Sequence, residues 1–187
     1  LDADGKPVPF YDAVVGGRSV GTPGVLRMLA HAHAQHGKLP WATLFAPAIT
    51  YAQQGFAISP RLHAQLKADA YLRLDPTARA YFYQANGEPH PVGYVLRNPE
   101  LAALLQRIAV EGVQAFYSGT VAQDVVRKVQ QHPTRPGRLA LSDLAGYQAK
   151  ERPPVCFDHA ALSRVYRVCG FPPPSSGAIA MGQIFGM

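Results

Sequence analysis

The stretch Val165-Tyr-Arg-Val-Cys-Gly-Phe-Pro-Pro-Pro-Ser-Ser-Gly-Ala-Ile179 combines three kinds of local structure. Its first part, Val165–Cys169, is rich in β-branched and aromatic residues and predicts a strand. The consecutive prolines that follow lack a backbone N–H and have a fixed φ, so they predict a sharp loop. From Gly177 onward the chain is apolar and predicts a helix. A strand, a tight loop and a helix in direct succession indicate a mixed fold.

The remainder of the chain is predicted to form one further strand and several helices, so the fold is mostly helical. Another strand candidate, Val155–Phe157, precedes the stretch. Three helix starts pair a capping residue with a proline, because the side-chain oxygen can accept a free first-turn N–H and proline at the first helical position loses no bond. They are Thr22-Pro23, Ser59-Pro60 and Asn98-Pro99. We therefore predict an α+β, mostly helical chain, with a helical part at about 20–147 and the strand pair, loop and last helix at about 148–187.

Some details of the helical part can also be predicted. The helix after Thr22 should end at Gly37 in a left-handed cap and bury the face that carries Val25, Leu26, Met28 and Leu29. Helices are expected at 99–111 and 120–131. Residues 76–98 hold aromatic side chains between turn signals, so they predict a turn-rich stretch with room for one short hairpin.

Composition excludes several classes of protein. The chain has 187 residues, of which 48% are hydrophobic, and a net charge of +6. No apolar run is long enough for a membrane span, and no secretory signal is visible at the start. The basic residues are scattered, and their densest stretch, Arg127 to Arg138, is interrupted by Pro133 and Pro136. A nucleic-acid partner is therefore not expected.

No motif for a cofactor, metal or catalytic group stands out from the residues themselves. His33 and His36 share a helix face, but no further metal ligand is suggested nearby. The glycines of Gly16–Gly21 lack the lysine of a phosphate-binding loop, and no Gly-x-Ser-x-Gly elbow occurs. We therefore expect no metal and no cofactor, and assign no catalytic residue.

The two cysteines are expected to be free thiols. If the predicted hairpin turned around Ala161, Cys156 would face Tyr166. Cys169 would then lie about 10 Å further along the strand, too far for a disulfide. Both thiols would instead be buried as small apolar groups.

The hydroxyls of the proline-rich loop have two possible roles. Ser175 and Ser176 lie between a predicted strand and a predicted helix. Such hydroxyls can cap the helix, or the free N–H groups there can hold an anion. Capping is the favoured interpretation.

The same loop resembles the Pro-Pro-Pro-Ser-Ser-Gly-Gly signature of the γ-glutamyltranspeptidases. The residues that match it are Pro172, Pro173, Pro174, Ser175, Ser176 and Gly177, and Ala178 replaces the usual second glycine. Further segments similar to the family follow one another in the expected order. They are Leu1-Asp-Ala-Asp-Gly-Lys-Pro7, Val20-Gly-Thr-Pro-Gly24, Gly37-Lys-Leu-Pro-Trp41, Ala46-Pro-Ala-Ile49, Gly55-Phe56, Asn98-Pro-Glu-Leu-Ala102, Ile108 to Gly112, Ala115-Phe-Tyr117, Leu141-Ser-Asp-Leu-Ala145 and Glu151-Arg152.

The resemblance implies an N-terminal-nucleophile hydrolase fold, an αββα sandwich of two subunits cut from one precursor. It also implies a threonine nucleophile at the start of the small subunit, activated by its own α-amine. This threonine would attack a γ-glutamyl amide such as glutathione and form an acyl-enzyme, which water or an amino acid then resolves. The resemblance implies no cofactor, and an arginine that pairs with the glutamyl carboxylate.

None of these functional residues can be carried over to the sequence. No threonine here stands in the family's Thr-Thr-His context, and Arg18 does not match the substrate arginine's motif. With Leu1 at one end and Met187 at the other, the chain is expected to be the middle of a large subunit, inactive alone. Its expected partners are the remainder of that subunit, the small subunit and γ-glutamyl compounds, and the isolated piece is expected to self-associate.

Two alternative functions remain open, and the family resemblance also implies a location for the parent protein. A cephalosporin-acylase-like amidase would share the implied scaffold. A different class is a stand-alone helical module that binds a small ligand or a partner through Tyr81–Tyr94 and its basic surface. Members of the resembled family are commonly exported, so the parent is expected in the periplasm or outside the cell.

Overall fold

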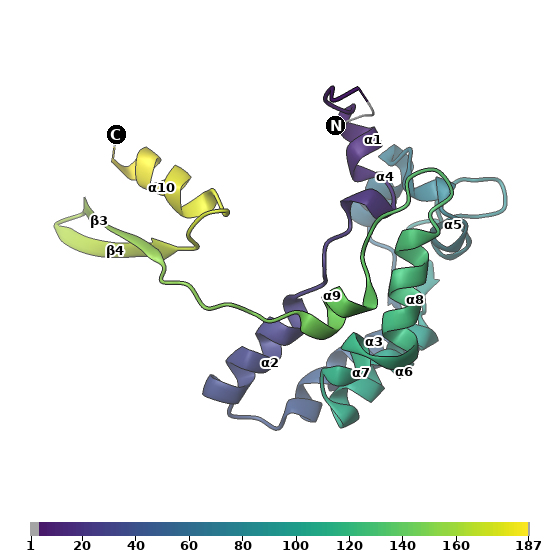
Figure 1. Cartoon of the computed structure of the whole chain (residues 1–187), viewed down its shortest axis with the longest axis horizontal. Helices are drawn as coiled ribbons and strands as arrows, with labels where there is room; N and C mark the ends of the chain where they lie inside the picture. The colour runs from purple at the N-terminus through teal and green to yellow at the C-terminus, as the bar shows by residue number, and fades with distance from the viewer. Residues whose placement is uncertain (1–3, 187) are drawn as a thin grey trace. The chain divides into compact units, whose positions relative to one another are not determined.

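The computed structural model describes residues 4–186, so the first residues of the Leu1–Pro7 motif and Met187 lie outside the described residues. The chain divides into two compact units, one ending at Gln148 and the other beginning at Ala149 (Figure 1). No helix among residues 4–186 is long and apolar enough to cross a membrane.

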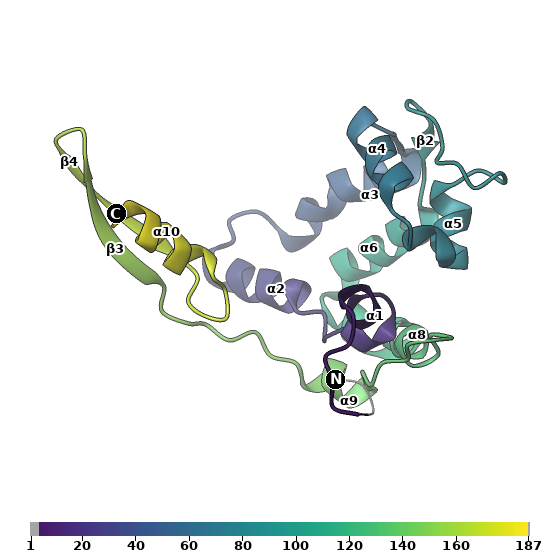
Figure 2. The ribbon, with the colours of Figure 1, turned by 90° about the horizontal axis from the view of Figure 1, so that it is seen from above.

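The first unit is almost entirely helical (Figure 2). A small sheet pairs β1 (Phe56–Ala57) with β2 (Val95–Leu96) in antiparallel fashion. Its α-helices are α1 (Phe10–Val14), α2 (Val25–His36), α3 (Ala46–Gln54), α4 (Pro60–Ala68), α5 (Pro76–Phe82), α6 (Pro99–Glu111), α7 (Gln114–Tyr117), α8 (Gly119–Gln130) and α9 (Leu141–Gly146). Its 3-10 turns are η1 (Gly17–Ser19), η2 (Trp41–Phe45) and η3 (Leu72–Leu74).

Two of the three predicted helix caps are confirmed. The Leu62 N–H donates to Ser59 Oγ at 3.1 Å, and the Leu101 N–H donates to Asn98 Oδ1 at 2.9 Å. The prediction for Thr22 is wrong, since α2 begins at Val25 without a side-chain cap. The reason is tertiary: the Tyr117 hydroxyl donates to the carbonyl oxygen of Pro23 at 2.6 Å and holds this segment outside the helix.

The left-handed cap predicted at Gly37 is also wrong. This glycine has an ordinary extended backbone, with φ of −65° and ψ of 134°. Space rather than conformation explains a glycine here, because a Cβ would lie 2.4 Å from His33 Cδ2. The His33 ring is held in that position by a 2.8 Å contact between its Nε2 and the carbonyl oxygen of Leu39.

Residues 76–98 were expected to form mainly turns, but the first part of this stretch is a helix, α5. Asp75-Pro76 begins α5 in the same way as the other capped starts, with the Ala78 N–H donating to Asp75 Oδ1 at 2.9 Å. After α5, Tyr83 and Pro89 form an isolated antiparallel bridge. The chain then enters β2, which pairs with the distant β1 rather than with a hairpin neighbour.

The first unit has two separate apolar cores. One lies around α7, α8 and α9 and contains Tyr117, Ala122, Val126, Val129, Leu139 and Leu144. The other lies between α4 and the small sheet and contains Ile58, Leu66, Tyr83 and Leu96. The buried face predicted for α2 is not present, since no residue of that helix is buried. Only Leu26 among the four predicted positions packs against a core, and Val25, Met28 and Leu29 are exposed.

The second unit is a β-hairpin followed by a helix. Strands β3 (Val155–Ala161) and β4 (Arg164–Gly170) are antiparallel, and α10 (Gly177–Phe185) follows the proline-rich loop. Helix α10 packs on β3, where the ring of Phe185 lies 4.7 Å from that of His159 and 6.1 Å from that of Phe157. Both predicted strands are confirmed and are longer than predicted.

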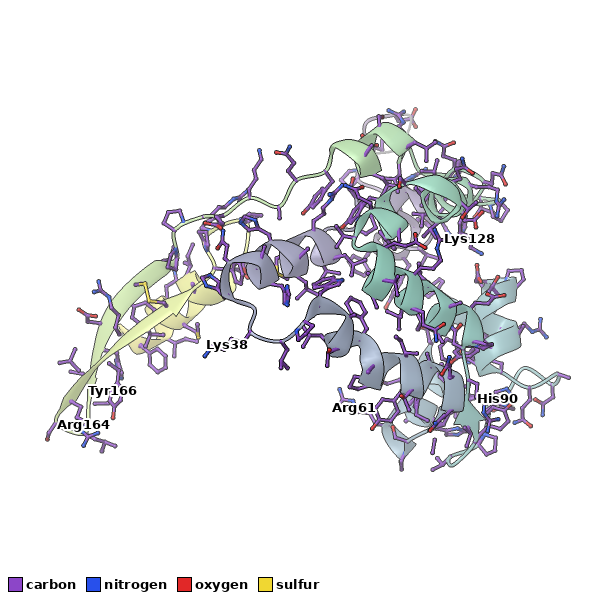
Figure 3. The ribbon with its side chains drawn as sticks, turned by 90° about the horizontal axis from the view of Figure 1, so that it is seen from below. Lys38, Arg61, His90, Lys128, Arg164 and Tyr166 are labelled. Carbon is purple, nitrogen blue, oxygen red and sulfur yellow. A yellow bond between two sulfur atoms is a disulfide. The ribbon has the colours of Figure 1, made fainter. Side chains whose placement is uncertain are left out.

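The prediction of two free thiols is wrong, because Cys156 and Cys169 form a disulfide (Figure 3). The hairpin turns at Leu162 and Ser163, whose φ angles of 49° and 61° are those of a tight two-residue turn. This moves the centre of the hairpin beyond Ala161 and sets Cys156 directly opposite Cys169, with their Cα atoms 4.2 Å apart. The predicted offset between the cysteines therefore disappears.

Asp75 gives a first testable prediction. Besides the Oδ1 atom that caps α5, its Oδ2 atom accepts a hydrogen bond from Lys128 Nζ at 2.7 Å. Together, the Lys128 ammonium and the Ala78 N–H lower the pKa of Asp75 below its ordinary value of 3.8. We expect Asp75→Ala to cost about 1 kcal/mol of stability at neutral pH, mostly through the lost cap, and Asp75→Asn to cost less, because asparagine also caps well.

The pH dependence follows from the direction of this shift. A lowered pKa in the folded state adds stability above pH 3.8 that is lost as the pH falls through the folded value. Urea unfolding between pH 7 and pH 2.5 should show a shallower acid limb for both Asp75 variants. The matched control is Asp124→Asn, which breaks an ion pair whose side chains are both exposed, and should change stability by less than about 0.5 kcal/mol. An unchanged acid limb in Asp75→Asn would contradict the prediction.

Candidate functional site

The proline-rich loop lies between the end of β4 and the start of α10, and two hydrogen bonds fix its backbone. The Ser175 N–H donates to the carbonyl oxygen of Pro172, and Arg152 Nη1 donates to that of Pro173, both at 3.1 Å. The peptide bond between Pro173 and Pro174 is cis. Arg152 belongs to the segment that leads into β3, so it joins the entry of the hairpin to the loop at its exit.

Close contact between Gly170 and Ala178 holds the two ends of the loop together. A Cβ on Gly170 would lie 2.8 Å from the Cβ of Ala178, which leaves no room for any other residue there. Ala178 is buried. At this position, where the signature usually has glycine, a methyl group fits against the bare backbone of Gly170.

The serines do not play the predicted capping role. Ser176 is the N-cap residue of α10 but has helical backbone angles and makes no side-chain cap. Both Ser175 and Ser176 are exposed. The loop thus presents two hydroxyls and the first N–H groups of α10, all of which can donate hydrogen bonds. This arrangement can orient a neighbouring group, but it brings together no nucleophile, base and acid.

The other residues considered from the sequence lie in the first unit. Arg18 is in η1 and His33 and His36 are in α2. Among residues 4–186, no group of three or more histidine, cysteine, aspartate or glutamate side chains has the arrangement of a metal site. Arg18, His33 and His36 thus belong to the first unit, and the proline-rich loop belongs to the second.

Sequence reasoning missed Tyr117, which is distant in sequence from the Val20–Gly24 motif but contacts it directly. Its hydroxyl donates to the carbonyl oxygen of Pro23 at 2.6 Å and accepts from the Arg27 N–H at 3.3 Å. Burial raises the pKa of Tyr117, partly offset by its contacts with Arg27. Spacing could not reveal the contact between Tyr117 and Pro23, because the two residues are 94 positions apart. Tyr117 belongs to a segment that matched the resembled family, but nothing local marks its hydroxyl.

Known proteins are similar to this chain over nearly its whole length. The family model described as Gamma-glutamyltranspeptidase matches residues 1–187. Glutathione hydrolase 2 of Arabidopsis thaliana is 40% identical over 89% of this chain and 28% of its own length. The crystal structure of Helicobacter pylori gamma-Glutamyltranspeptidase superposes with a TM-score of 0.87 at 28% identity, over 99% of this chain and 51% of that one.

A cephalosporin acylase from Bacillus halodurans is also similar, with a TM-score of 0.71 and 31% identity over 87% of this chain and 30% of its own. The chain spans between 26% and 31% of the length of the first curated relatives it matches. Within that span it has the fold of the corresponding part of an N-terminal-nucleophile hydrolase. The family model matches all 187 residues of this chain, the motifs occur in the family's order, and the signature loop is present. The chain therefore belongs to the γ-glutamyltranspeptidase family.

Proposed function

We propose that the parent protein is a γ-glutamyl acyltransferase and hydrolase that acts on glutathione or related γ-glutamyl compounds. The observation that carries the proposal is the match of all 187 residues to the family model, with glutathione hydrolases among the relatives. In this mechanism an N-terminal threonine attacks the γ-glutamyl carbonyl and expels the amine. Water or an acceptor amine then releases the glutamyl group from the acyl-enzyme.

We assign a structural role to the chain itself. None of its threonines stands in the expected nucleophile context, and the described loop lacks the set of groups that acyl transfer needs. Its hairpin and α10 offer exposed apolar side chains on which further elements of the precursor can pack, among them Ile179, Ile184 and Phe185. The remainder of the large subunit and the small subunit are therefore the proposed partners, and the 187 residues alone are expected to be inactive.

The test compares three samples in a γ-glutamyl-p-nitroanilide assay: the full-length gene product, its nucleophile variant and the 187-residue chain. The nucleophile is the threonine found at the start of the small subunit by N-terminal sequencing after self-cleavage. Its change to alanine should abolish self-cleavage and lower turnover by at least about 10³-fold, and the 187-residue chain should show no turnover. Unchanged turnover in the alanine variant would overturn the mechanism.

A second candidate is an amidase of the cephalosporin-acylase kind, favoured by the similarity to the Bacillus halodurans enzyme. The two candidates share the scaffold and differ in the acyl group that the enzyme accepts. Glutaryl amides lack the α-ammonium group that γ-glutamyl amides carry. Comparing kcat/KM for matched glutaryl and γ-glutamyl anilides separates them, because the proposed function requires a clear preference for the γ-glutamyl substrate.

We also propose a periplasmic or extracellular location for the parent. The Cys156–Cys169 bond supports this, since disulfides persist mainly in oxidising compartments. Cell fractionation followed by thiol alkylation under denaturing conditions tests the proposal. The expected result is full-length protein outside the cytosol with both cysteines protected from alkylation. Cytosolic protein with alkylated cysteines would contradict it.

A further inference from the structure

An open groove in the first unit lies between two segments that are distant in sequence. Arg18 and residues 20–22 line it from one segment, and residues 136–139 with Asp143 line it from the other. Its volume is about 600 Å³, which is the size of a small-molecule site. Arg18 and Arg138 both line this groove.

The frame of the groove is held by its backbone. The Arg18 N–H donates to the carbonyl oxygen of Arg135 at 3.2 Å, and the Gly137 N–H donates to that of Val129 at 2.9 Å. The two segments approach so closely that a Cβ on Gly17 would lie 2.1 Å from the Val129 oxygen. A Cβ on Gly137 would be equally close to the Gly17 oxygen. These contacts fix where the two arginine side chains leave the backbone.

The charges around the groove are distributed unevenly. Three other cations of the first unit are neutralised by ion pairs: Arg135 with Asp12, Lys128 with Asp75 and Arg127 with Asp124. Arg18 and Arg138 make no ion pair among the described residues. The single carboxylate of the groove, that of Asp143, already accepts the Ala140 N–H at 2.9 Å. The lining thus keeps a net positive charge and two guanidinium groups with free donors.

We propose that this groove binds a small oxyanion, a carboxylate or a phosphate, between Arg18 and Arg138. A guanidinium group is planar, stays charged and offers paired N–H donors that match either anion. Neither side chain must break an existing ion pair to bind it. Thr22 also lines the groove, and its hydroxyl can act as a further neutral donor. The site uses none of the residues proposed for acyl transfer, so it stands independently of the parent's activity.

The experiment is a titration of the 187-residue chain with glutarate and, separately, with inorganic phosphate, followed by two-dimensional amide NMR at low salt. Glutaramide, which has the shape of glutarate without its charge, is the ligand control. We expect saturable shifts at the amides of Gly21 and Gly137, which weaken as ionic strength rises. The glutarate and phosphate arms show which of the two oxyanions is preferred. Absence of shifts with both anions, or equal shifts with glutaramide, would overturn the proposal.

Variants test whether the two arginines are responsible. The Arg18→Ala/Arg138→Ala double variant should bind at least 10-fold more weakly, and Arg18→Lys should lose affinity although it keeps the charge. Arg61→Ala is the matched control, because Arg61 is an exposed arginine on α4 that does not line the groove (Figure 3). Equal losses in the control and the double variant would show general charge attraction and overturn the site. Melting curves of each variant confirm folding.

Discussion

Reduction of the Cys156–Cys169 disulfide is expected to lower the stability of the second unit by about 3 kcal/mol. The bond closes a loop with a sequence separation of 13 residues, and a loop of this length restricts the unfolded chain by about that amount. The second unit has little else to stabilise it by itself, since Ala178 is the only apolar residue buried there among those described. Small units with a small core depend on such cross-links.

Hydrogen exchange measured by mass spectrometry separates the two units in one experiment. Reduction should speed exchange of the β3 and β4 amides by about 10²-fold, the factor that corresponds to about 3 kcal/mol. Amides of α6 and α8 in the first unit should be unaffected. A Cys156→Ser/Cys169→Ser variant should match the reduced protein without added reductant. Unchanged exchange in β3 and β4 under both conditions would show that the bond does not stabilise the hairpin.

Removal of the Tyr117 side chain is expected to have the largest effect in the first unit. This side chain is 1% exposed and lies in the core around α8. Its hydroxyl donates to the Pro23 carbonyl oxygen, and the centroid of its ring lies 4.5 Å from the guanidinium carbon of Arg27. The Nε of Arg27 is buried and has no hydrogen-bond partner among residues 4–186. We expect Tyr117→Ala to cost about 3–5 kcal/mol. Tyr117→Phe, which leaves the Pro23 oxygen unpaired, should cost about 1–3 kcal/mol.

Urea unfolding followed by the fluorescence of Trp41 measures both variants, because this single tryptophan donates to the carbonyl oxygen of Ile108 within the same unit. The control is Tyr147→Phe. The Tyr147 ring is parallel to that of Tyr117 at 6.4 Å, but no described hydrogen bond depends on its hydroxyl, so the expected change is below about 0.5 kcal/mol. Equal losses in Tyr117→Phe and Tyr147→Phe would contradict a specific role of the Tyr117 hydroxyl.

Alkaline pH gives a second measurement on the same variant. Burial raises the pKa of Tyr117 above 10.0, so the folded state holds this proton more tightly than the unfolded state. The resulting stability is fully present below pH 10 and is lost as the pH rises through the higher folded value. Tyr117→Phe should therefore show a flatter alkaline limb than the unchanged protein, whereas Tyr147→Phe should not.

Local chemistry explains which structural predictions succeeded. The caps at Ser59 and Asn98 depend on an acceptor and an N–H three residues apart, and both formed. The helix predicted at 99–111 has the observed bounds of α6, because a capped start, an apolar stripe and a closing glycine agree there. Asp75 carries the same signal and caps α5, but the turn residues that follow it favoured a turn-rich prediction.

The disulfide shows how one local choice changes a long-range contact. Cys156 and Cys169 pair only if the hairpin turns at Leu162 and Ser163. Those residues lack the glycine or asparagine that usually marks such a turn. The turn sequence therefore could not predict the register of the β3–β4 hairpin. An error of one and a half residues in the centre of a hairpin shifts the pairing by three.

The sequence by itself determined the family, the mixed fold and the order of the main elements, because motifs, caps and apolar periodicity act over a few residues. Only the tertiary structure decided three features: the Cys156–Cys169 pairing, the exclusion of Thr22 from α2 by Tyr117, and the groove lined by both Arg18 and Arg138. Each of these depends on groups brought together by packing across a turn or across the core. The free energies that fix them come from contacts between distant segments, for which the sequence carries no local signal.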